Sequence, residues 1–415
     1  MAFRLFGRGK DSADGHDDGG EYSPIRSAAV AVWYERSRAS ADTYDVFTSL
    51  MDDRKPSFRT DEEAAAWFSE LEESGDLPAT TILGVMNEEG LCVPKSEEKA
   101  ALLYRKAAEQ GYAPAQNCLG NSYRFGRGVP QSNEKAVEWY GKAANQGCAR
   151  AQGRLGEMYA KGLGVPQSYL EAVDLCTEAT DKGDALGQNR LGMMYQKGQG
   201  LPQSDSESAR YYRKAAEQGF HEAEYNYGWM CYAGRGVKQS DREAALWYGK
   251  AAESGDAYAQ CSLGNMYKNG RGVLKSDEKA VELYMKSAEQ GYAVAQNNLA
   301  FMYREGIGIG KSYSEALRWY GKAAEQGHAG AQCTLGLMYY NGTGTPQSYE
   351  EAFFWLEKAA KNGDPPSQLY IAAMYERGEG VTRSLMSARE WYQKAADQLE
   401  DFSVRKDAQE ALKRL

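Results

Sequence analysis

The sequence predicts an all-α protein built as a solenoid of 36-residue helix-turn-helix repeats. Its 415 residues include 45 glycines and 29 tyrosines, an excess of both that indicates periodic use. Nine repeats follow one another from 79 to 402 without an insertion, the first three starting at residues 79, 115 and 151. The sixth position of each repeat is a glycine, or an alanine in two copies: Gly84, Gly120, Gly156, Gly192, Gly228, Gly264, Ala300, Gly336 and Ala372.

The repeat 115–150 shows two stretches with helical periodicity. In the first, Ala115 and Leu119 lie on one face at helical spacing, and the pattern continues to about Phe125. The second begins after Ser132 and carries an inner stripe of alanines and aromatic residues. Each repeat is therefore expected to be a pair of antiparallel helices.

Glycine and serine mark the ends of these helices. Glycine occupies the twelfth position in all nine copies, from Gly90 to Gly378, where a left-handed conformation ends the first helix. Serine occupies the eighteenth position in all nine copies, as expected of an N-cap for the second helix. In five copies a glutamate follows three residues later, which predicts a reciprocal capping box: Ser168/Glu171, Ser204/Glu207, Ser240/Glu243, Ser312/Glu315 and Ser348/Glu351.

The pattern A-x-x-x-L-G-x-x-Y-x-x-G-x-G-V, followed by K-A-x-x-W-Y-x-K-A-A-x-Q-G, resembles the Sel-one-like repeat, a relative of the tetratricopeptide repeat. Repeats 115–150, 259–294 and 331–366 match it almost throughout. The resemblance implies a right-handed α/α superhelical solenoid that serves as an adaptor for protein complexes. It also implies that the first helices line the concave side.

Both ends of the array depart from the pattern, with Asn87 in place of a tyrosine and Leu399 in place of the closing glycine. We expect looser packing there. Within the degenerate N-terminal repeat, Ala64 and Phe68 keep their 36-residue spacing. The preceding segment Ser27–Arg38 is expected to form a short helix rather than a strand-like arm. The expected parts are a disordered tail (1–22), a short docking segment (23–42), a degenerate capping repeat (43–78), nine repeats (79–402) and a C-terminal capping helix (403–415).

Composition argues against several classes of function. The net charge of −9 lacks the basic footprint of a nucleic-acid binder. There is no apolar run long enough to span a membrane, and no secretory signal is recognised. With three histidines and no catalytic constellation, we expect neither an enzyme nor a metal or cofactor site.

The seven cysteines fall at six repeat positions without a CxxC pair. Some secreted members of the resembling family join the helices of each repeat by regularly spaced disulfides and are associated with penicillin-like ligands. That regular pair is missing here, so we expect packing thiols, a reducing compartment and a cytoplasmic location.

The outward positions of the first helices are the candidate binding surface. At about 100° per residue, the third, seventh, tenth and eleventh positions lie opposite the core side. The methionines at the eighth position fall on the core side, where packing is the expected role. The candidate groove residues are Asn189, Tyr225, Trp229, Tyr232, Asn265, Lys268, Asn297, Phe301, Arg304 and Tyr340.

These residues predict a non-enzymatic scaffold that binds a protein or peptide in the concave groove, because buried aromatic residues are frequent interface hot spots. The alternative for Trp229 is that it fills space between neighbouring first helices. The pairs Asn265/Lys268 and Asn297/Arg304 resemble the clamp with which some tetratricopeptide proteins hold a peptide carboxylate, and the alternative is a solvated polar surface.

Two other functions remain open at this stage. The chain could be a regulatory subunit that docks an enzyme or a membrane surface through its N-terminal arm, which comprises 3–10 and 30–33. It could also be an effector-type protein that interacts with a host.

Overall fold

The computed structural model describes residues 58, 60–398 and 402–415. Within these residues the regular elements are twenty α-helices, which confirms the all-α solenoid of 36-residue repeats. The chain divides into two compact halves, Met1–Ala223 and Glu224–Leu415. The expected tail, the docking segment with its helix, and the first part of the degenerate repeat lie outside the described residues.

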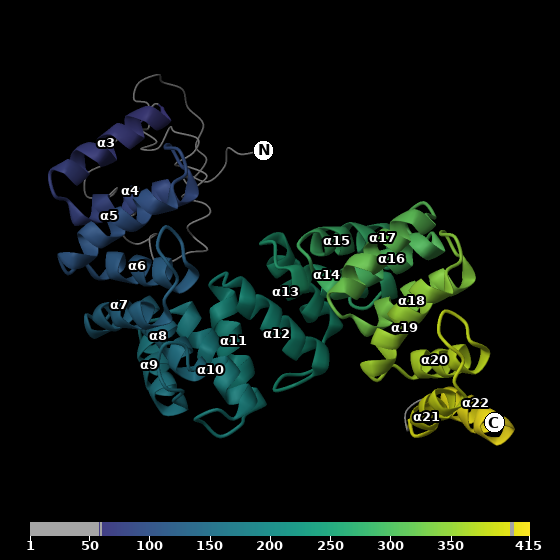
Figure 1. Cartoon of the computed structure of the whole chain (residues 1–415). Helices are drawn as coiled ribbons and strands as arrows, with labels where there is room; N and C mark the ends of the chain where they lie inside the picture. Colours follow the sequence, from purple (N-terminus) through teal and green to yellow (C-terminus); the bar gives the residue numbers. More distant parts are fainter. Residues whose placement is uncertain (1–57, 59, 399–401) are drawn as a thin grey trace, which may run out of the picture. The chain divides into compact units, whose positions relative to one another are not determined.

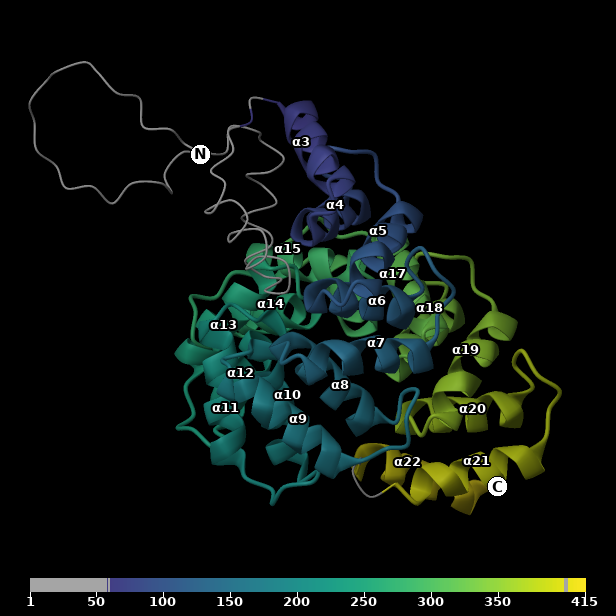
Figure 2. The same ribbon diagram turned by 90° about the vertical axis from the view of Figure 1, so that its left-hand side faces the viewer.

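Each repeat contributes one first helix and one second helix, and within each half consecutive helices lie side by side (Figures 1 and 2). The first helices are α4 (Leu77–Glu89), α6 (Ala113–Phe125), α8 (Ala149–Lys161), α10 (Ala185–Lys197), α12 (His221–Ala233), α14 (Ala257–Asn269), α16 (Ala293–Glu305), α18 (Ala329–Asn341) and α20 (Pro365–Arg377). The second helices are α5 (Glu97–Glu109), α7 (Asn133–Asn145), α9 (Tyr169–Asp181), α11 (Asp205–Glu217), α13 (Asp241–Glu253), α15 (Asp277–Glu289), α17 (Tyr313–Glu325), α19 (Tyr349–Lys361) and α21 (Leu385–Ala396).

The serine at the eighteenth position caps the second helix, as predicted. In the second repeat, the Ser132 hydroxyl accepts the backbone N–H of Lys135 at 3.2 Å. The reciprocal half of the capping box was wrong, because the serine backbone N–H has another partner. It donates to the carbonyl of the ninth residue of the repeat, in the last turn of the first helix, as from Ser132 to Tyr123 at 2.9 Å, and the same bond occurs in all nine repeats. The loop thus ties the two helices together through the backbone.

A second glycine of the loop, at the fourteenth position, sets the contact between successive repeats. Gly128 has a φ of +66°, and a Cβ placed on it would overlap the backbone carbonyl of Glu97 at the start of the preceding second helix. The first repeat has Cys92 at this position, also left-handed with a φ of 58°. At Gly128, a side chain is therefore excluded by the backbone of the preceding helix and not only by the torsion-angle preference of glycine.

Small residues at the sixth position let the helices of a pair approach closely. The ring of Tyr140 in α7 lies directly over Gly120 in α6, and Tyr140 has no exposed surface. The methionines of the eighth position are all buried, which confirms their role in core packing. Alanines of the first position, such as Ala115 and Ala259, are also fully buried.

A glutamine at the second position links the two ends of a repeat. Gln146 donates its side-chain amide to Gln116 at 2.7 Å, and Gln290 donates to Gln260 at 2.9 Å. The fifth repeat carries Glu224 instead. This carboxyl group is buried, and its Oε2 has no hydrogen-bond partner among the described residues.

The two ends of the array are covered by helices outside the nine pairs. At the N-terminal end, α3 (Asp61–Glu73) buries Ala64 and Phe68 at the positions that the 36-residue spacing singled out. At the C-terminal end, α22 (Phe402–Arg414) buries Ala408 and packs against α21. Its remaining surface is rich in charged residues, as required of a terminal cap.

Gly128→Ala should destabilise the protein because of both backbone strain and overlap with the preceding helix. We expect a loss of about 2–5 kcal/mol, from roughly 1–2 for the left-handed backbone and 1–3 for the overlap. Gly111→Ala is the control, since Gly111 has a φ of +89° but no atom within 4 Å of a Cβ. Urea unfolding followed by circular dichroism measures both variants, and equal losses would contradict the role given to the overlap.

The burial of Glu224 raises its pKa above the ordinary value of 4.5, although Lys250 acts in the opposite direction. A raised pKa in the folded state means that folding favours the protonated group, so its contribution to stability is present below pH 4.5 and is lost as the pH rises through the folded pKa. Glu224→Gln should remove this loss and stabilise the protein near pH 7 by about 1–3 kcal/mol.

The measurement is the urea midpoint of wild type and Glu224→Gln between pH 4 and pH 8. Gln260→Glu is the matched control, because it places a carboxyl group at the same repeat position and should introduce the same dependence. A pH profile that is parallel for wild type and Glu224→Gln would show that this carboxyl group is not buried.

Candidate functional site

The candidate site lies on the outward positions of α12, α14, α16 and α18, here called the first-helix face of the second half. A second helix contributes to it as well, because the buried tyrosine of α15 reaches through to this surface. Tyr284 of α15 donates its hydroxyl to Asn265 Oδ1 of α14 at 2.6 Å. Burial raises the pKa of Tyr284, so its hydroxyl remains a donor. Asn265 therefore has a structural task in addition to any binding role.

Trp229 and Tyr232 of α12 are half-buried on this face, each beside an arginine of a repeat loop. The Arg235 guanidinium lies 5.4 Å from the Trp229 ring centroid, and that of Arg271 lies 4.3 Å from Tyr232. Arg271 also forms an ion pair with Asp241 at 2.8 Å. The predicted aromatic surface is therefore interleaved with cations.

The centre of the face is the ring of Phe301 in α16, which two cations share. Lys268 Nζ from α14 lies 4.5 Å from the ring centroid, and the Arg304 guanidinium lies 5.3 Å from it. Arg304 pairs with the exposed Glu305 at 2.6 Å. Lys268 has no acidic partner among the described residues. Lys268, Phe301 and Arg304 were all predicted as groove residues, and the structure brings the three side chains together.

Asparagines surround this cluster and differ in how far they are engaged. Asn298 donates its amide to Asn265 Oδ1 at 3.3 Å, which joins α16 to α14. Asn297 is half-buried and forms no side-chain hydrogen bond with the described residues. Of the two asparagines in the predicted clamp, Asn297 therefore has the side chain available for a ligand.

Tyr225 and Tyr340 lie at opposite ends of the face and are held by their neighbours. Tyr225 packs on Tyr248 and Tyr258, with ring centroids 5.6 and 6.0 Å apart. Burial raises the pKa of Tyr225. Tyr340 donates its hydroxyl to Glu379 at 2.8 Å.

The placement of Asn189 on the groove surface was wrong, because its side chain has no exposed area in the structure. A side chain at the third position of a repeat points towards the space between neighbouring first helices. The angle of about 100° per residue had predicted that it points outward. Cys261 and Cys333 occupy the same position in later repeats and are also buried. Tyr225 and Asn297, also at the third position, remain partly accessible.

In the first half, the corresponding face carries a buried ionic network in addition to the exposed aromatic residue Phe125. Glu157 of α8 pairs with Arg124 of α6 at 2.9 Å and with Arg190 of α10 at 3.3 Å. Arg190 also pairs with Glu222 at 2.7 Å. Although burial opposes its ionisation, the two arginines hold the pKa of Glu157 well below its usual range. These charges are satisfied within the protein, which favours the second half as the binding region.

Within the described residues there is no group of three or more histidine, cysteine or acidic side chains placed to hold a metal ion. None of the helices described is long and apolar enough to cross a membrane. None of the seven cysteines, all of which lie in the described part of the chain, forms a disulfide, and burial raises the pKa of Cys261 and Cys333 to about 12. Those two thiols are therefore packing groups rather than nucleophiles.

Family comparison matches the Sel1 repeat nine times in succession. The matched residues are 78–112, 113–148, 149–184, 185–220, 221–256, 257–292, 293–328, 329–364 and 365–398. The chain belongs to the Sel1-repeat family. Members of this family are generally protein-interaction scaffolds.

Two solved structures resemble this Sel1-repeat protein over most of its length. One is c5321, a protective antigen of uropathogenic Escherichia coli strains that displays the same fold; it has 33% identity and a TM-score of 0.64, covering 93% of this chain and 81% of that one. The other is a Sel1 repeat protein from Oxalobacter formigenes, with 30% identity and a TM-score of 0.55, covering 77% of this chain and 93% of that one. No curated protein matches the sequence.

Sequence reasoning missed Arg271 and Asn298 on the face of this Sel1-repeat protein. A recurring spacing could have identified Arg271, because the thirteenth residue of one repeat contacts the tenth residue of the preceding one. The pairs Tyr232/Arg271 and Tyr340/Glu379 both have a separation of 39 residues, which is one repeat plus three. Residues separated by the repeat length of 36 do not include these contacts.

The two clamp asparagines should differ in their effect on stability. Asn265→Ala removes the acceptor of the buried Tyr284 hydroxyl and should cost about 1–3 kcal/mol. Asn297→Ala removes no hydrogen bond and should stay within about 0.5 kcal/mol of wild type. Urea midpoints of the two variants decide this, and a large loss for Asn297→Ala would mean that its amide has a partner inside the protein.

Proposed function

We propose that the protein is a non-enzymatic scaffold that binds a protein or peptide partner on the first-helix face of the second half. The observation that supports this most is the pair of cations on Phe301, since Lys268 lacks an acidic partner among the described residues. Cations and aromatic rings held close together provide both charge and apolar area for a partner.

The chemistry of the face favours a partner segment with a carboxylate next to an apolar side chain. Lys268 and Arg304 present charge on both sides of Phe301, and Asn297 offers free amide donors beside them. A carboxylate would accept charge-assisted hydrogen bonds from these groups while its apolar neighbour covers the ring. Trp229 and Tyr232 extend the same combination over α12. We therefore propose that the clamp formed by Lys268, Asn297 and Arg304 binds an acidic side chain or a chain terminus.

Trp229→Ala/Phe301→Ala should abolish capture of the partner, because each truncated aromatic anchor at a hot spot costs about 2 kcal/mol or more, which is about thirtyfold in affinity. Affinity purification with mass spectrometry identifies the partner, and calorimetry with the purified partner measures the loss. Lys268→Glu should weaken binding of the same partner although Trp229 and Phe301 are still present.

Phe125→Ala is the matched control. Phe125 is an exposed aromatic residue on α6 of the first half, with Arg124 and Arg127 within 5.1 and 5.2 Å of its ring centroid. Its loss should leave binding unchanged. Helical circular dichroism confirms that each variant is folded.

Deleting residues 1–42 separates this proposal from docking through the N-terminal arm. Binding that survives the deletion and is lost in Trp229→Ala/Phe301→Ala supports the first-helix face. The opposite result would assign recognition to the arm and overturn the proposal. Cysteines that form no disulfide among the described residues fit a scaffold that works in a reducing, cytoplasmic compartment.

A further inference from the structure

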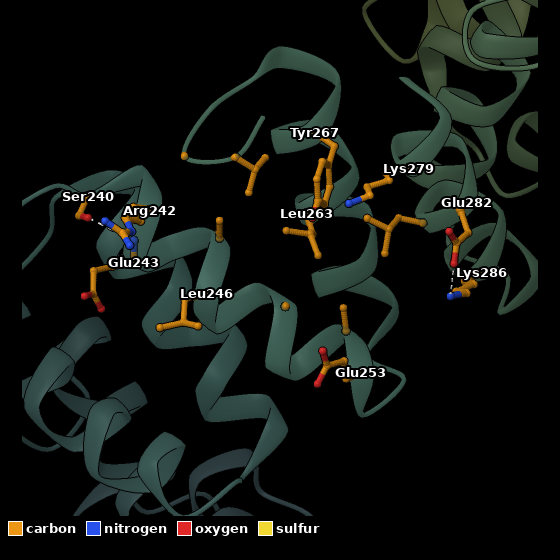
Figure 3. A pocket seen from close by; sticks show the side chains of 16 residues that line it. Ser240, Arg242, Glu243, Leu246, Glu253, Leu263, Tyr267, Lys279, Glu282 and Lys286 are labelled. Carbon is orange, nitrogen blue, oxygen red and sulfur yellow. Dashed lines mark hydrogen bonds and ion pairs between the residues drawn. The ribbon is translucent and has the colours of Figure 1, made fainter. Parts of the chain in front are cut away.

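A cavity opens on the opposite side of the second half, between the second helices α13 and α15 (Figure 3). Its volume is about 780 Å³, within the range of sites that hold a drug-sized ligand. Leu263 and Tyr267 of α14 form its floor, Leu246 projects from the α13 wall, and Leu283 of α15 also lines it. None of these residues belongs to the first-helix face, so the cavity is independent of the proposed function.

The cavity exists because three large side chains found elsewhere in the array are missing here. At the twenty-third and twenty-seventh positions, α13 has the small residues Ala245 and Gly249. At the twenty-fifth position, α15 has Leu283 where five of the nine repeats carry tryptophan. No other pair of consecutive repeats combines alanine, glycine and leucine at these positions. A Cβ on Gly249 would meet no atom within 4 Å.

An exposed leucine forms the edge of this cavity. The side chain of Leu246 is 54% exposed at the twenty-fourth position, where six of the nine repeats have a charged residue. Leu102 and Phe354 are the other apolar residues at this position. An exposed leucine beside an apolar cavity is a feature of surfaces that bind a partner.

The charged residues at the edge include Glu243 beside Arg242, and an ion pair of Lys286 with Glu282 at 2.6 Å, besides three charges that no ion pair neutralises. Arg242 and Lys279 stand near the N-termini of α13 and α15, and neither has an acidic partner among the described residues. Lys279 lies over the Tyr267 ring at 5.2 Å. Glu253 stands at the C-terminal end of α13, and no cation pairs with it within the described part of the chain. A ligand that complements this arrangement is apolar in the middle and acidic at one end.

We propose that this cavity, here called the α13/α15 pocket, is a second binding site that accepts an amphipathic helix of a partner protein. Leucine or phenylalanine side chains of the partner fill the space over Gly249 and contact Leu246. An aspartate or glutamate of the same helix lies against Arg242 and Lys279. The wall from Arg242 to Glu253 contains twelve residues and is about 16 Å long, which matches three turns of a docked helix.

The test uses a phage-displayed library of three-turn helical peptides, selected on the full chain and counter-selected on Gly249→Leu. Leucine at 249 fills the pocket from a helical position with open space, so this variant should stay folded and become slightly more stable. The enriched peptides, synthesised with fluorescein, are then titrated by fluorescence anisotropy. We expect apolar residues at helical spacing with an acidic residue at one end.

Affinity for these peptides should fall at least tenfold in Gly249→Leu and Leu246→Glu, and at least fivefold in Arg242→Glu. Gly321→Leu and Phe354→Glu are the matched controls at the same repeat positions and should bind as wild type does. Equal enrichment on wild type and Gly249→Leu would overturn the site. Peptides without an acidic residue, or full binding by Arg242→Glu, would overturn the proposed chemistry of the partner.

Discussion

The backbone hydrogen bond from the eighteenth residue to the ninth determines the geometry of every repeat. It joins the start of the second helix to the last turn of the first one, as from Ser132 to Tyr123. Because both groups belong to the backbone, the bond makes little demand on the surrounding side chains. The glycine of the fourteenth position then brings successive repeats into contact, as at Gly128. Side chains on both outer faces can therefore vary without changing the array.

Most of this frame could be predicted from the sequence, because its signals are local and repeated nine times. Glycines such as Gly90 end helices, serines such as Ser96 begin them, and both act within a few residues of their own position. The capping box failed within a single repeat, where the serine N–H donates to the ninth residue, whereas the errors on the binding surface depended on how neighbouring repeats pack. Asn189 is buried because the third position points between first helices, which no periodicity within one helix can show. Arg271 reaches Tyr232 across a repeat boundary, so its role follows only from the stacking.

The tenth and seventh positions of the first helices serve two purposes at once. In the repeats of Tyr104 and Tyr284 they provide Glu88 and Asn265 as acceptors for the buried tyrosine hydroxyl. In the repeat of Tyr320 the same region carries Arg304, which is a donor and cannot accept that proton. A hydrogen bond to the buried tyrosine hydroxyl therefore does not explain why Arg304 stands where other repeats have an acceptor. This is the physical reason to place recognition around Phe301 rather than where the acceptors are retained.

The two proposed binding sites of the second half are built in opposite ways. On the first-helix face, large side chains project: the aromatic ring of Phe301 and the cations beside it. Between α13 and α15 the side chains are small, at Ala245 and Gly249, and the space between the two helices remains open. A core without a backbone frame would close around missing side chains and lose the cavity. In a solenoid whose helices are held in place by backbone hydrogen bonds in the loops, small side chains leave an open pocket between neighbouring helices.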